Sequence, residues 1–194
     1  MAKTKAPLFS LSARGQLAET LVYFPWKGLE CVRSYVIPAN PNTAGQRTQR
    51  GYFGNAVDDW HDIGLDADDV SAWNRAASAL SKPMSGFNAF VGAHVDLQVA
   101  GETPNMGFNG SLTDDADGTF TGLITEAGSA TAVDMLWGVS PTSLINTEPG
   151  TEAVNVWTCD PTANVSGQII YARFLIKAAG DIIGRTGIYR VKVA

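Results

Sequence analysis

The feature that most constrains the fold is a series of short β-prone runs that begins after residue 104. The runs span residues 107–112, 119–125, 130–137, 153–159, 168–178 and 187–193. Segments 115–118 and 148–150 lie between runs and carry Asp, Pro and Gly, which favour tight turns. Apolar residues alternate with other residues in the later runs, most clearly at Ile170, Ala172, Phe174 and Ile176. Short alternating runs at this spacing predict an antiparallel β-sandwich over residues 105–194.

Residues 43–100 show helical periodicity instead. Thr43, Asp66 and Ser85 are expected N-caps, because a short polar side chain there accepts a hydrogen bond from the first helical turn. The expected inner faces are Phe53, Ala56, Val57, Trp60 and Ile63 in the first helix, Val70, Trp73, Ala77 and Leu80 in the second, and Phe87, Phe90, Val91, His94 and Val95 in the third. The pattern predicts a compact three-helix unit that residues 101–104 link to the sandwich.

Residues 1–42 are expected to form a basic arm with a β-hairpin. Two β-prone runs flank the pair Lys27-Gly28, which favours a tight turn. Pro25 has no N–H to donate, so we expect the hairpin either at the edge of a sheet or extending away from the body of the protein. An isolated hairpin is only marginally stable in water, which indicates that it needs a partner. The predicted fold class is therefore α+β: an N-terminal β-hairpin arm and a three-helix unit, followed by an antiparallel β-sandwich.

The charge is unevenly distributed along the chain. Residues 1–50 carry seven basic and two acidic residues, a net charge of +5, whereas residues 51–104 carry −6 and residues 105–194 carry −4. A basic end on an acidic body can drive head-to-tail association between copies of the chain. Ordinary variation along a sequence explains the same asymmetry, so both interpretations stay open.

Few residues offer catalytic or cofactor-binding chemistry, and we expect no enzyme activity, no bound metal and no cofactor. His61 and His94 lack the spacing of a zinc-binding helix, and Cys31 and Cys159 lie far apart in the sequence. Segment 114–118 carries three carboxylates, as calcium loops do, but it lacks the distal glutamate of such a loop. A β-turn is the simpler interpretation of that segment.

A cluster of aspartates is the basis of one alternative, a hydrolase in which paired carboxylates act as acid and base. The cluster comprises Asp58, Asp59, Asp62, Asp66, Asp68 and Asp69. Their positions at helix ends and on outer faces indicate solvated caps instead. Nucleic acid is not an expected partner, because the sequence pI is near 4.9 and the basic, aromatic patch around Arg33, Arg47 and Arg50 is small.

No run of about 18 apolar residues occurs, so neither a transmembrane helix nor a membrane partner is predicted. The lysines at positions 3 and 5 are not followed by an apolar stretch, so we expect no signal peptide. The chain is therefore expected to be made and used in a cytoplasm.

One ordered set of residues runs through the N-terminal half. It reads Ser12-Ala13-Arg14-Gly15, Leu21-Val22-Tyr23, Trp26-Lys27-Gly28, Val32-Arg33-Ser34-Tyr35-Val36, Pro38, Asn40-Pro41-Asn42-Thr43, Gln46 and Gln49-Arg50, then Phe53, Ala56-Val57, Trp60, Ala72-Trp73-Asn74 and Gly86-Phe87-Asn88-Ala89-Phe90. This set resembles a family of small virion structural proteins of tailed bacteriophages and prophages. The resemblance implies a structural role in the virion, after synthesis in the host bacterial cytoplasm.

The C-terminal half resembles immunoglobulin-like and fibronectin-like modules. The resemblance lies in residues 132–137, the following Gly138-Val139-Ser140-Pro141, and Tyr171. It implies that the sandwich is immunoglobulin-like. Modules of this kind are common as outward-facing appendages on phage heads and tails.

These observations predict an accessory structural protein of a bacteriophage virion, such as a capsid decoration or a head- or tail-associated protein. Its N-terminal half would dock on capsid, neck or tail subunits, including copies of itself. The expected docking residues are Arg14, Trp26, Arg33, Tyr35, Arg47 and Arg50. The alternatives are the hydrolase and a carbohydrate- or surface-binding adhesion module. That module would recognise a host-surface glycan through Trp137 or Trp157.

Overall fold

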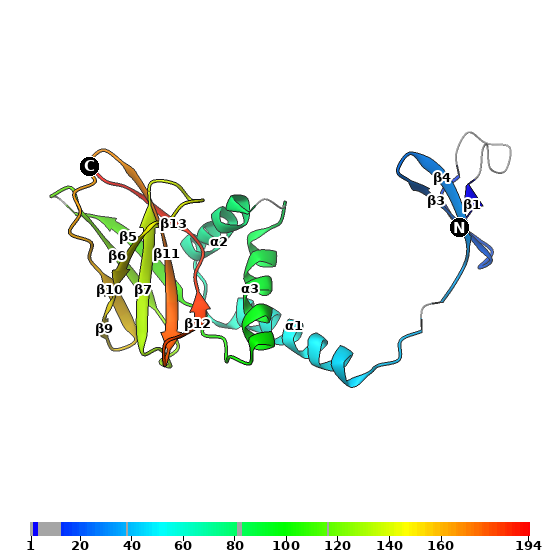
Figure 1. Ribbon diagram of the computed structural model, residues 1–194, viewed down its shortest axis with the longest axis horizontal. Coiled ribbons are helices and arrows are strands. Elements are labelled where there is room, and N and C mark those ends of the chain that lie inside the picture. Colours follow the sequence, from blue (N-terminus) through cyan, green and yellow to red (C-terminus); the bar gives the residue numbers. More distant parts are fainter. Residues whose placement is uncertain (1, 4–12, 38, 81–82, 116) are drawn as a thin grey trace. The chain divides into compact units, whose positions relative to one another are not determined.

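The computed structural model shows an α+β protein with two compact units (Figure 1). It describes residues 2–3, 13–37, 39–80, 83–115 and 117–194. The N-terminal unit is Met1–Thr43 and the C-terminal unit is Ala44–Ala194. Residues 4–12, which are part of the expected basic arm, lie outside the described residues.

The N-terminal unit contains a four-stranded antiparallel sheet with the strand order β1-β4-β3-β2. Its strands are β1 (Ala2–Lys3), β2 (Gly15–Leu17), β3 (Leu21–Trp26) and β4 (Leu29–Ser34). The predicted hairpin is confirmed as β3–β4, with Lys27 and Gly28 in its turn. Both turn residues have positive φ, 50° and 78°, which is the backbone twist that a two-residue hairpin turn requires.

The position of Pro25 corrects the expectation that the hairpin lies at the edge of a sheet. β3 lies between β4 and β2, so it is a central strand rather than an edge strand. However, β2 pairs only with the segment Leu21 to Tyr23, and Pro25 lies beyond the end of that pairing. Pro25 is opposite Glu30 on β4 alone, so its missing N–H interrupts no second ladder.

The C-terminal unit begins with the three predicted helices. They are α1 (Ala44–Asp62), α2 (Ala67–Ala79) and α3 (Gly86–Ala100). Two predicted N-caps are confirmed. The Asp66 carboxylate accepts a hydrogen bond from the Asp69 N–H at 2.7 Å, and the Ser85 hydroxyl accepts one from the Asn88 N–H at 3.3 Å. Gly101 ends α3 in the left-handed conformation.

Two antiparallel sheets follow the helices. One has the order β5-β6-β10-β9, and the other has the order β12-β11-β7-β8, with β13 also paired to β11. The strands are β5 (Phe108–Asp114), β6 (Phe120–Thr125), β7 (Ala132–Gly138), β8 (Asn146–Pro149), β9 (Thr151–Ala153), β10 (Val156–Cys159), β11 (Ile169–Ala178), β12 (Asp181–Arg185) and β13 (Tyr189–Lys192).

These sheets have immunoglobulin-like connectivity. β5, β6, β10 and β9 correspond to strands A, B, E and D of such a domain, and β7, β11 and the β12–β13 segment correspond to C, F and G. Side chains from both sheets meet in one core, which includes Phe120, Ile124, Met135, Trp157 and Phe174. The alternation predicted for β11 is confirmed, because Ile170, Ala172, Phe174 and Ile176 are all fully buried.

Helices and sandwich, which we expected as separate units over 43–100 and 105–194, form one compact unit. The joint is α2. The Ile188 N–H donates to the Ala72 carbonyl at 2.9 Å, and the Ile188 carbonyl accepts from Arg75 Nη1 at 2.6 Å. A Cβ at Gly187 would lie 2.3 Å from the Ala72 carbonyl carbon, so only glycine permits this close approach.

This packing also corrects the expected inner faces of the helices. Val70 and Leu80 are exposed, whereas Ala72, Trp73 and Ala76 are buried. The reason is that α2 packs on two sides. Ala72 belongs to the sandwich core, while Trp73 and Ala76 belong to a second core that includes Phe90 of α3. Within the described residues, no helix has both the length and the apolar character needed to cross a membrane.

Candidate interaction surface

The N-terminal unit exposes apolar side chains on its sheet. Trp26 and Leu29 are directly opposite each other at the hairpin end, and they are 57% and 46% exposed. Opposite residues in an antiparallel pair share a face, and so do residues two apart in a strand. Phe24 and Cys31 therefore lie on the same face as Trp26. Among the residues of this sheet whose side chains are described, only Cys31 is buried.

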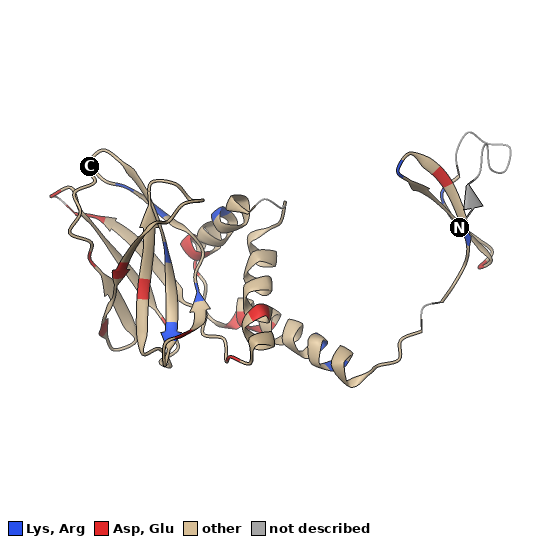
Figure 2. Cartoon of the chain, viewed as in Figure 1, with Lys and Arg blue, Asp and Glu red and all other residues tan. Residues whose placement is uncertain are grey.

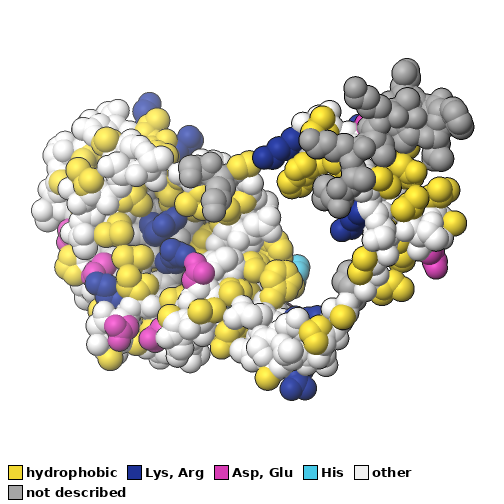
Figure 3. Space-filling view, turned by 45° about the vertical axis from the view of Figure 1, so that its right-hand side comes forward, with side chains coloured by type: hydrophobic (Ala, Val, Ile, Leu, Met, Phe, Trp, Pro, Cys, Tyr) yellow, Lys and Arg dark blue, Asp and Glu magenta, His cyan; other side chains and the backbone are white. Residues whose placement is uncertain are grey.

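Apolar residues continue on the other face and beyond the last strand. Leu17 of β2 is opposite Leu21 of β3 and is exposed. Val36 and Ile37 follow β4 and are 64% and 76% exposed. Figure 3 shows hydrophobic side chains at the surface of the N-terminal unit. A sheet with apolar side chains on both faces has much to gain from contact with another protein.

Positive charge accompanies this apolar surface. Arg33 is opposite Val22, so it lies on the same face as Phe24 and Trp26. Its guanidinium lies 5.7 Å from the centre of the Phe24 ring, which is a cation–π arrangement. The N-terminal unit has five basic and two acidic residues, a net charge of +3. Because the whole chain has a net charge of −5, the C-terminal unit has a net charge of −8. Figure 2 shows the acidic residues of the helices and the sandwich.

The six expected docking residues are divided between the two units. Arg14, Trp26, Arg33 and Tyr35 belong to the N-terminal unit, while Arg47 and Arg50 lie in the exposed first part of α1. The structure brings Trp26 and Arg33 to one face of the sheet. Tyr35 is half-buried, and its N–H donates to the Thr20 carbonyl at 2.7 Å.

The sequence interpretation did not include Leu29, Val36 and Ile37 in the surface. A signal for them was present, because all three are large apolar residues beside turn-forming positions. Leu29 follows the Lys27-Gly28 turn, and Ile37 precedes a proline. Apolar residues beside turns have little chance of burial within a small unit. They are therefore candidates for contact with a partner.

Asp69 differs most from the expectation for the aspartate cluster. It is fully buried rather than a solvated cap. Its carboxylate accepts hydrogen bonds from the N–H groups of Asp66 at 3.1 Å, Asn109 at 2.8 Å and Gly110 at 3.1 Å, and from the Tyr189 hydroxyl. Burial, and then the adjacent Asp69 carboxylate, raise the pKa of the Tyr189 hydroxyl. The carboxylate thus joins α2 to two strands of the sandwich.

The other candidate catalytic groups are dispersed. His94 is buried, and its Nε2 lies 2.6 Å from a carboxylate oxygen of Asp59, whereas His61 is exposed. Cys31 and Cys159 are free thiols in different units. Within the described ranges, no three His, Cys, Asp or Glu side chains come together as a metal site requires.

The acidic turn between β5 and β6 uses its carboxylates internally. Asp117 Oδ1 accepts from the Thr119 N–H at 3.1 Å and from the Thr119 hydroxyl at 2.6 Å. Those hydrogen bonds, that of the hydroxyl first, lower the pKa of the Asp117 carboxyl. Asp115 accepts from the Thr121 hydroxyl at 2.8 Å. Ala116 lies outside the described residues.

Glu126 is a buried carboxylate that organises the loop between β6 and β7. Its Oε2 accepts from Asn105 Nδ2 at 2.6 Å and from the backbone N–H groups of Gly128, Ser129 and Ala130. Burial raises the pKa of the Glu126 carboxyl, but the four hydrogen bonds together lower it by more. The resulting pKa is below the usual value.

The adhesion alternative named Trp137 and Trp157 as sugar-binding residues. Trp137 is 8% exposed and Trp157 is 5% exposed, and both belong to the sandwich core. Neither ring is available to stack on a sugar, so the prediction that these two tryptophans bind a glycan is wrong.

The fold and the surface together define an immunoglobulin-like sandwich with a helical base and a separate, partly apolar sheet. No family model matches the sequence, and no curated protein matches it. Among solved structures, the chain is similar to the crystal structure of the Br derivative of BhCBM56, at 15% identity and a TM-score of 0.33. That alignment covers 43% of this chain and 88% of the other. A likeness this distant indicates neither fold nor function.

Proposed function

We propose that the chain is an accessory structural protein of a bacteriophage virion. It docks on neighbouring capsid, neck or tail subunits through the N-terminal unit and projects the immunoglobulin-like sandwich outward. One observation carries the docking part: the small N-terminal sheet leaves Trp26, Leu29, Val36 and Ile37 exposed. The virion part is supported by the resemblance of the N-terminal half to phage structural proteins.

Size is the first physical reason for a partner. A unit of about 40 residues without a disulfide, a metal or a partner rarely buries enough apolar surface to fold stably. Full burial of an exposed Leu or Val side chain contributes about 1.5–3 kcal/mol. Burial of Leu29, Val36 and Ile37 by a partner therefore stabilises the sheet and the complex together.

Residue type is the second reason. Trp, Tyr and Arg are enriched among the residues that dominate binding energy at protein interfaces. Trp26 and Arg33 share one face, with the apolar Phe24 between them in the sheet. Positive charge around an apolar centre suits an acidic partner surface. The C-terminal unit, at −8, is such a surface, so copies of the chain are among the partners.

The hydrolase alternative is less well supported than an assembly role. The Asp69 carboxylate already accepts four hydrogen bonds that hold the fold, and Asp59 is paired with His94. Carboxylates that are engaged in this way are poorly placed to exchange protons with a substrate.

The test is incorporation of the chain into phage particles that assemble in the host bacterium. We would compare the wild-type chain with Trp26→Ser and with a variant that lacks residues 1–43, and measure copies per particle by mass spectrometry. Ile145→Ser is the matched control, because Ile145 is 81% exposed but lies in the C-terminal unit.

We expect the deletion to abolish incorporation and Trp26→Ser to weaken it by about 2 kcal/mol, which is roughly a 30-fold loss of affinity. Ile145→Ser should incorporate as the wild type does. If the chain without residues 1–43 occupies particles at the wild-type level, the docking role is wrong. If no particle contains even the wild-type chain, the virion assignment is wrong.

A further inference from the structure

A hollow in the C-terminal unit lies between α2 and the sandwich. It has a volume of about 330 Å³ and is lined by Arg75, Ser78, Ala79, Pro141, Thr142, Tyr171 and Arg190. A smaller hollow of about 120 Å³ shares Arg75 and Arg190 and adds Asp68 and Tyr189 to the lining. The larger volume is in the range of small-molecule sites in proteins.

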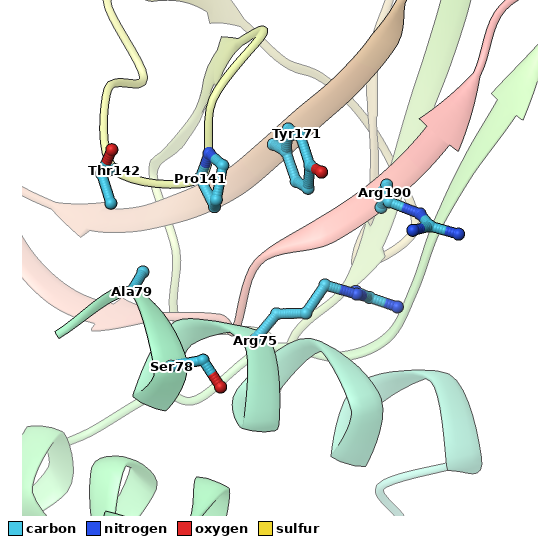
Figure 4. A pocket seen from close by; sticks show the side chains of 7 residues that line it. All are labelled: Arg75, Ser78, Ala79, Pro141, Thr142, Tyr171 and Arg190. Atoms are coloured by element: carbon cyan, nitrogen blue, oxygen red, sulfur yellow. The ribbon is translucent and has the colours of Figure 1, made fainter. Parts of the chain in front are cut away.

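Two guanidinium groups reach this hollow from different elements. Figure 4 shows Arg75 extending from α2 and Arg190 from β13, with both guanidinium groups on the same side of the hollow. Arg75 is held in place because its Nη1 donates to the Ile188 carbonyl at 2.6 Å. Arg190 is exposed. Among the side chains that the structure describes, neither arginine is ion-paired with a carboxylate.

The arrangement of two like charges is unfavourable without an anion. Burial lowers the pKa of the Arg75 guanidinium, and the nearby positive charge of Arg190 lowers it further, while Asp68 acts in the opposite direction. A bound anion would offset the repulsion between the two arginines. Guanidinium groups form paired, charge-assisted hydrogen bonds with carboxylates and phosphates.

The net charge around the hollows favours a monoanion. Arg75 and Arg190 contribute +2, and Asp68 contributes −1, so the lining carries a net charge of +1. A carboxylate matches this charge. A phosphate monoester, with a charge of about −1.5 to −2 at pH 7, exceeds it.

The rest of the lining suits a sugar ring. Tyr171 is half-buried and presents an aromatic ring, and Pro141 adds apolar surface beside it (Figure 4). Ser78 and Thr142 contribute hydroxyl groups at the same hollow. An aromatic face packs against the C–H groups of a sugar, while side-chain hydroxyls exchange hydrogen bonds with its hydroxyls.

We propose that Arg75 and Arg190 bind the carboxylate of a sugar acid, with its ring against Tyr171 and Pro141. The site is built entirely within the C-terminal unit. It therefore does not depend on the docking role of the N-terminal unit, and each proposal can fail without the other. A site for an acidic sugar on a projecting sandwich would let the chain recognise acidic glycans.

The test is titration of the full-length chain with sodium D-glucuronate, in which NMR chemical-shift changes measure binding. D-glucose is the neutral probe and inorganic phosphate is the probe with higher charge. Arg190→Gln removes one guanidinium at an exposed position. Lys192→Gln is the matched control, because Lys192 is exposed, lies two residues along β13 on the same face, and loses the same charge.

We expect saturable binding of D-glucuronate, weaker binding of D-glucose and phosphate, and at least a tenfold loss of glucuronate affinity in Arg190→Gln. Lys192→Gln should bind within about twofold of the wild type. Arg75→Lys keeps the charge but removes the bidentate guanidinium donor, so its affinity for glucuronate should also fall about tenfold. Absence of saturation up to ~50 mM D-glucuronate would overturn the proposal, since that corresponds to less than ~2 kcal/mol of binding. Phosphate binding as tight as glucuronate binding, or equal losses in Arg190→Gln and Lys192→Gln, would also overturn it.

Discussion

Replacement of Asp69 by asparagine should destabilise the C-terminal unit strongly. The two carboxylate oxygens divide four donors between them. Oδ1 accepts from the Gly110 N–H and the Tyr189 hydroxyl, and Oδ2 accepts from the Asp66 and Asn109 N–H groups. Asparagine has only one acceptor oxygen. Turned one way, its NH₂ group faces the N–H groups of Asp66 and Asn109; turned the other way, it faces the Gly110 N–H, while the Tyr189 hydroxyl can rotate and accept.

The magnitude follows from the hydrogen bonds that are lost or weakened. A hydrogen bond to a charged group is worth about 1.5–3 kcal/mol, and a buried donor that loses its partner costs about 1–3 kcal/mol. At least one buried donor loses its acceptor in Asp69→Asn and the remaining hydrogen bonds lose their charged acceptor, so we expect a loss of about 2–4 kcal/mol in the free energy of unfolding. That is a large share of the 5–15 kcal/mol typical of a whole domain.

The assay is urea unfolding followed by tryptophan fluorescence. Asp68→Asn is the control, because Asp68 lies in the same helical turn but is exposed. Its charge interacts with the helix dipole and with the nearby Arg75 guanidinium near the surface, so we expect a loss of about 0.3–1 kcal/mol. If Asp69→Asn costs no more than Asp68→Asn, then Asp69 does not join α2 to the sandwich in the way described.

Three further predictions concern other buried groups. Glu126→Gln should destabilise the protein at pH 7. The difference in the free energy of unfolding between variant and wild type should shrink as the pH falls from about 4.3 towards the lowered pKa of folded Glu126. The reason is that a protonated Glu126 no longer offers a charged acceptor to its four donors. Urea unfolding from pH 3 to pH 7 measures this, and a constant difference would contradict it. Burial raises the pKa of Cys159 to about 12, so its thiol should react with Ellman's reagent only when the sandwich opens. Cys31 should react much faster, because the small N-terminal unit opens more often, and mass mapping of the modified thiols would show a reversed order if this is wrong. Gly187→Ala should cost about 1–3 kcal/mol, because its Cβ would overlap the backbone of α2; a melting temperature equal to that of the wild type would contradict the close packing.

Local signals predicted the parts of the fold that depend on local chemistry. Asp66 and Ser85 cap helices because their side chains bond to N–H groups only three residues away. The alternation in β11 reports one buried face directly. By contrast, β8 and β9 are short strands over residues 146–153, and they carry Thr, Glu and Pro without a clear alternation, so no period indicates them.

The joint between helices and sandwich could not be predicted from the sequence. Asp69 and Tyr189 are 120 residues apart, and nothing in either local sequence indicates that they meet. An aspartate in the first turn of a helix is ordinarily a solvated partner of the helix dipole. Only the tertiary structure shows that this one is buried. The same holds for Arg75 and Arg190, which come from a helix and from the last strand.

The exposed surface of the N-terminal unit, which we propose as the docking surface, was predicted in part. Trp26 and Arg33 share a face, as an interaction site requires, because the Lys27-Gly28 turn fixes the register of β3 and β4. Arg47 and Arg50 belong to the C-terminal unit instead. Val36 and Ile37 are exposed because the small sheet does not cover them. The sequence pattern does not indicate which residues such a small sheet leaves uncovered.

Hydrogen exchange tests the docking claim most directly. Amide exchange of residues 13–37 would be measured by mass spectrometry in the free chain and in purified particles, with β11 as the internal reference. If the N-terminal unit docks, residues 13–37 should exchange rapidly in the free chain and become strongly protected in the particle, while β11 stays equally protected in both. Equal exchange of residues 13–37 in the free and particle-bound chain would contradict the account.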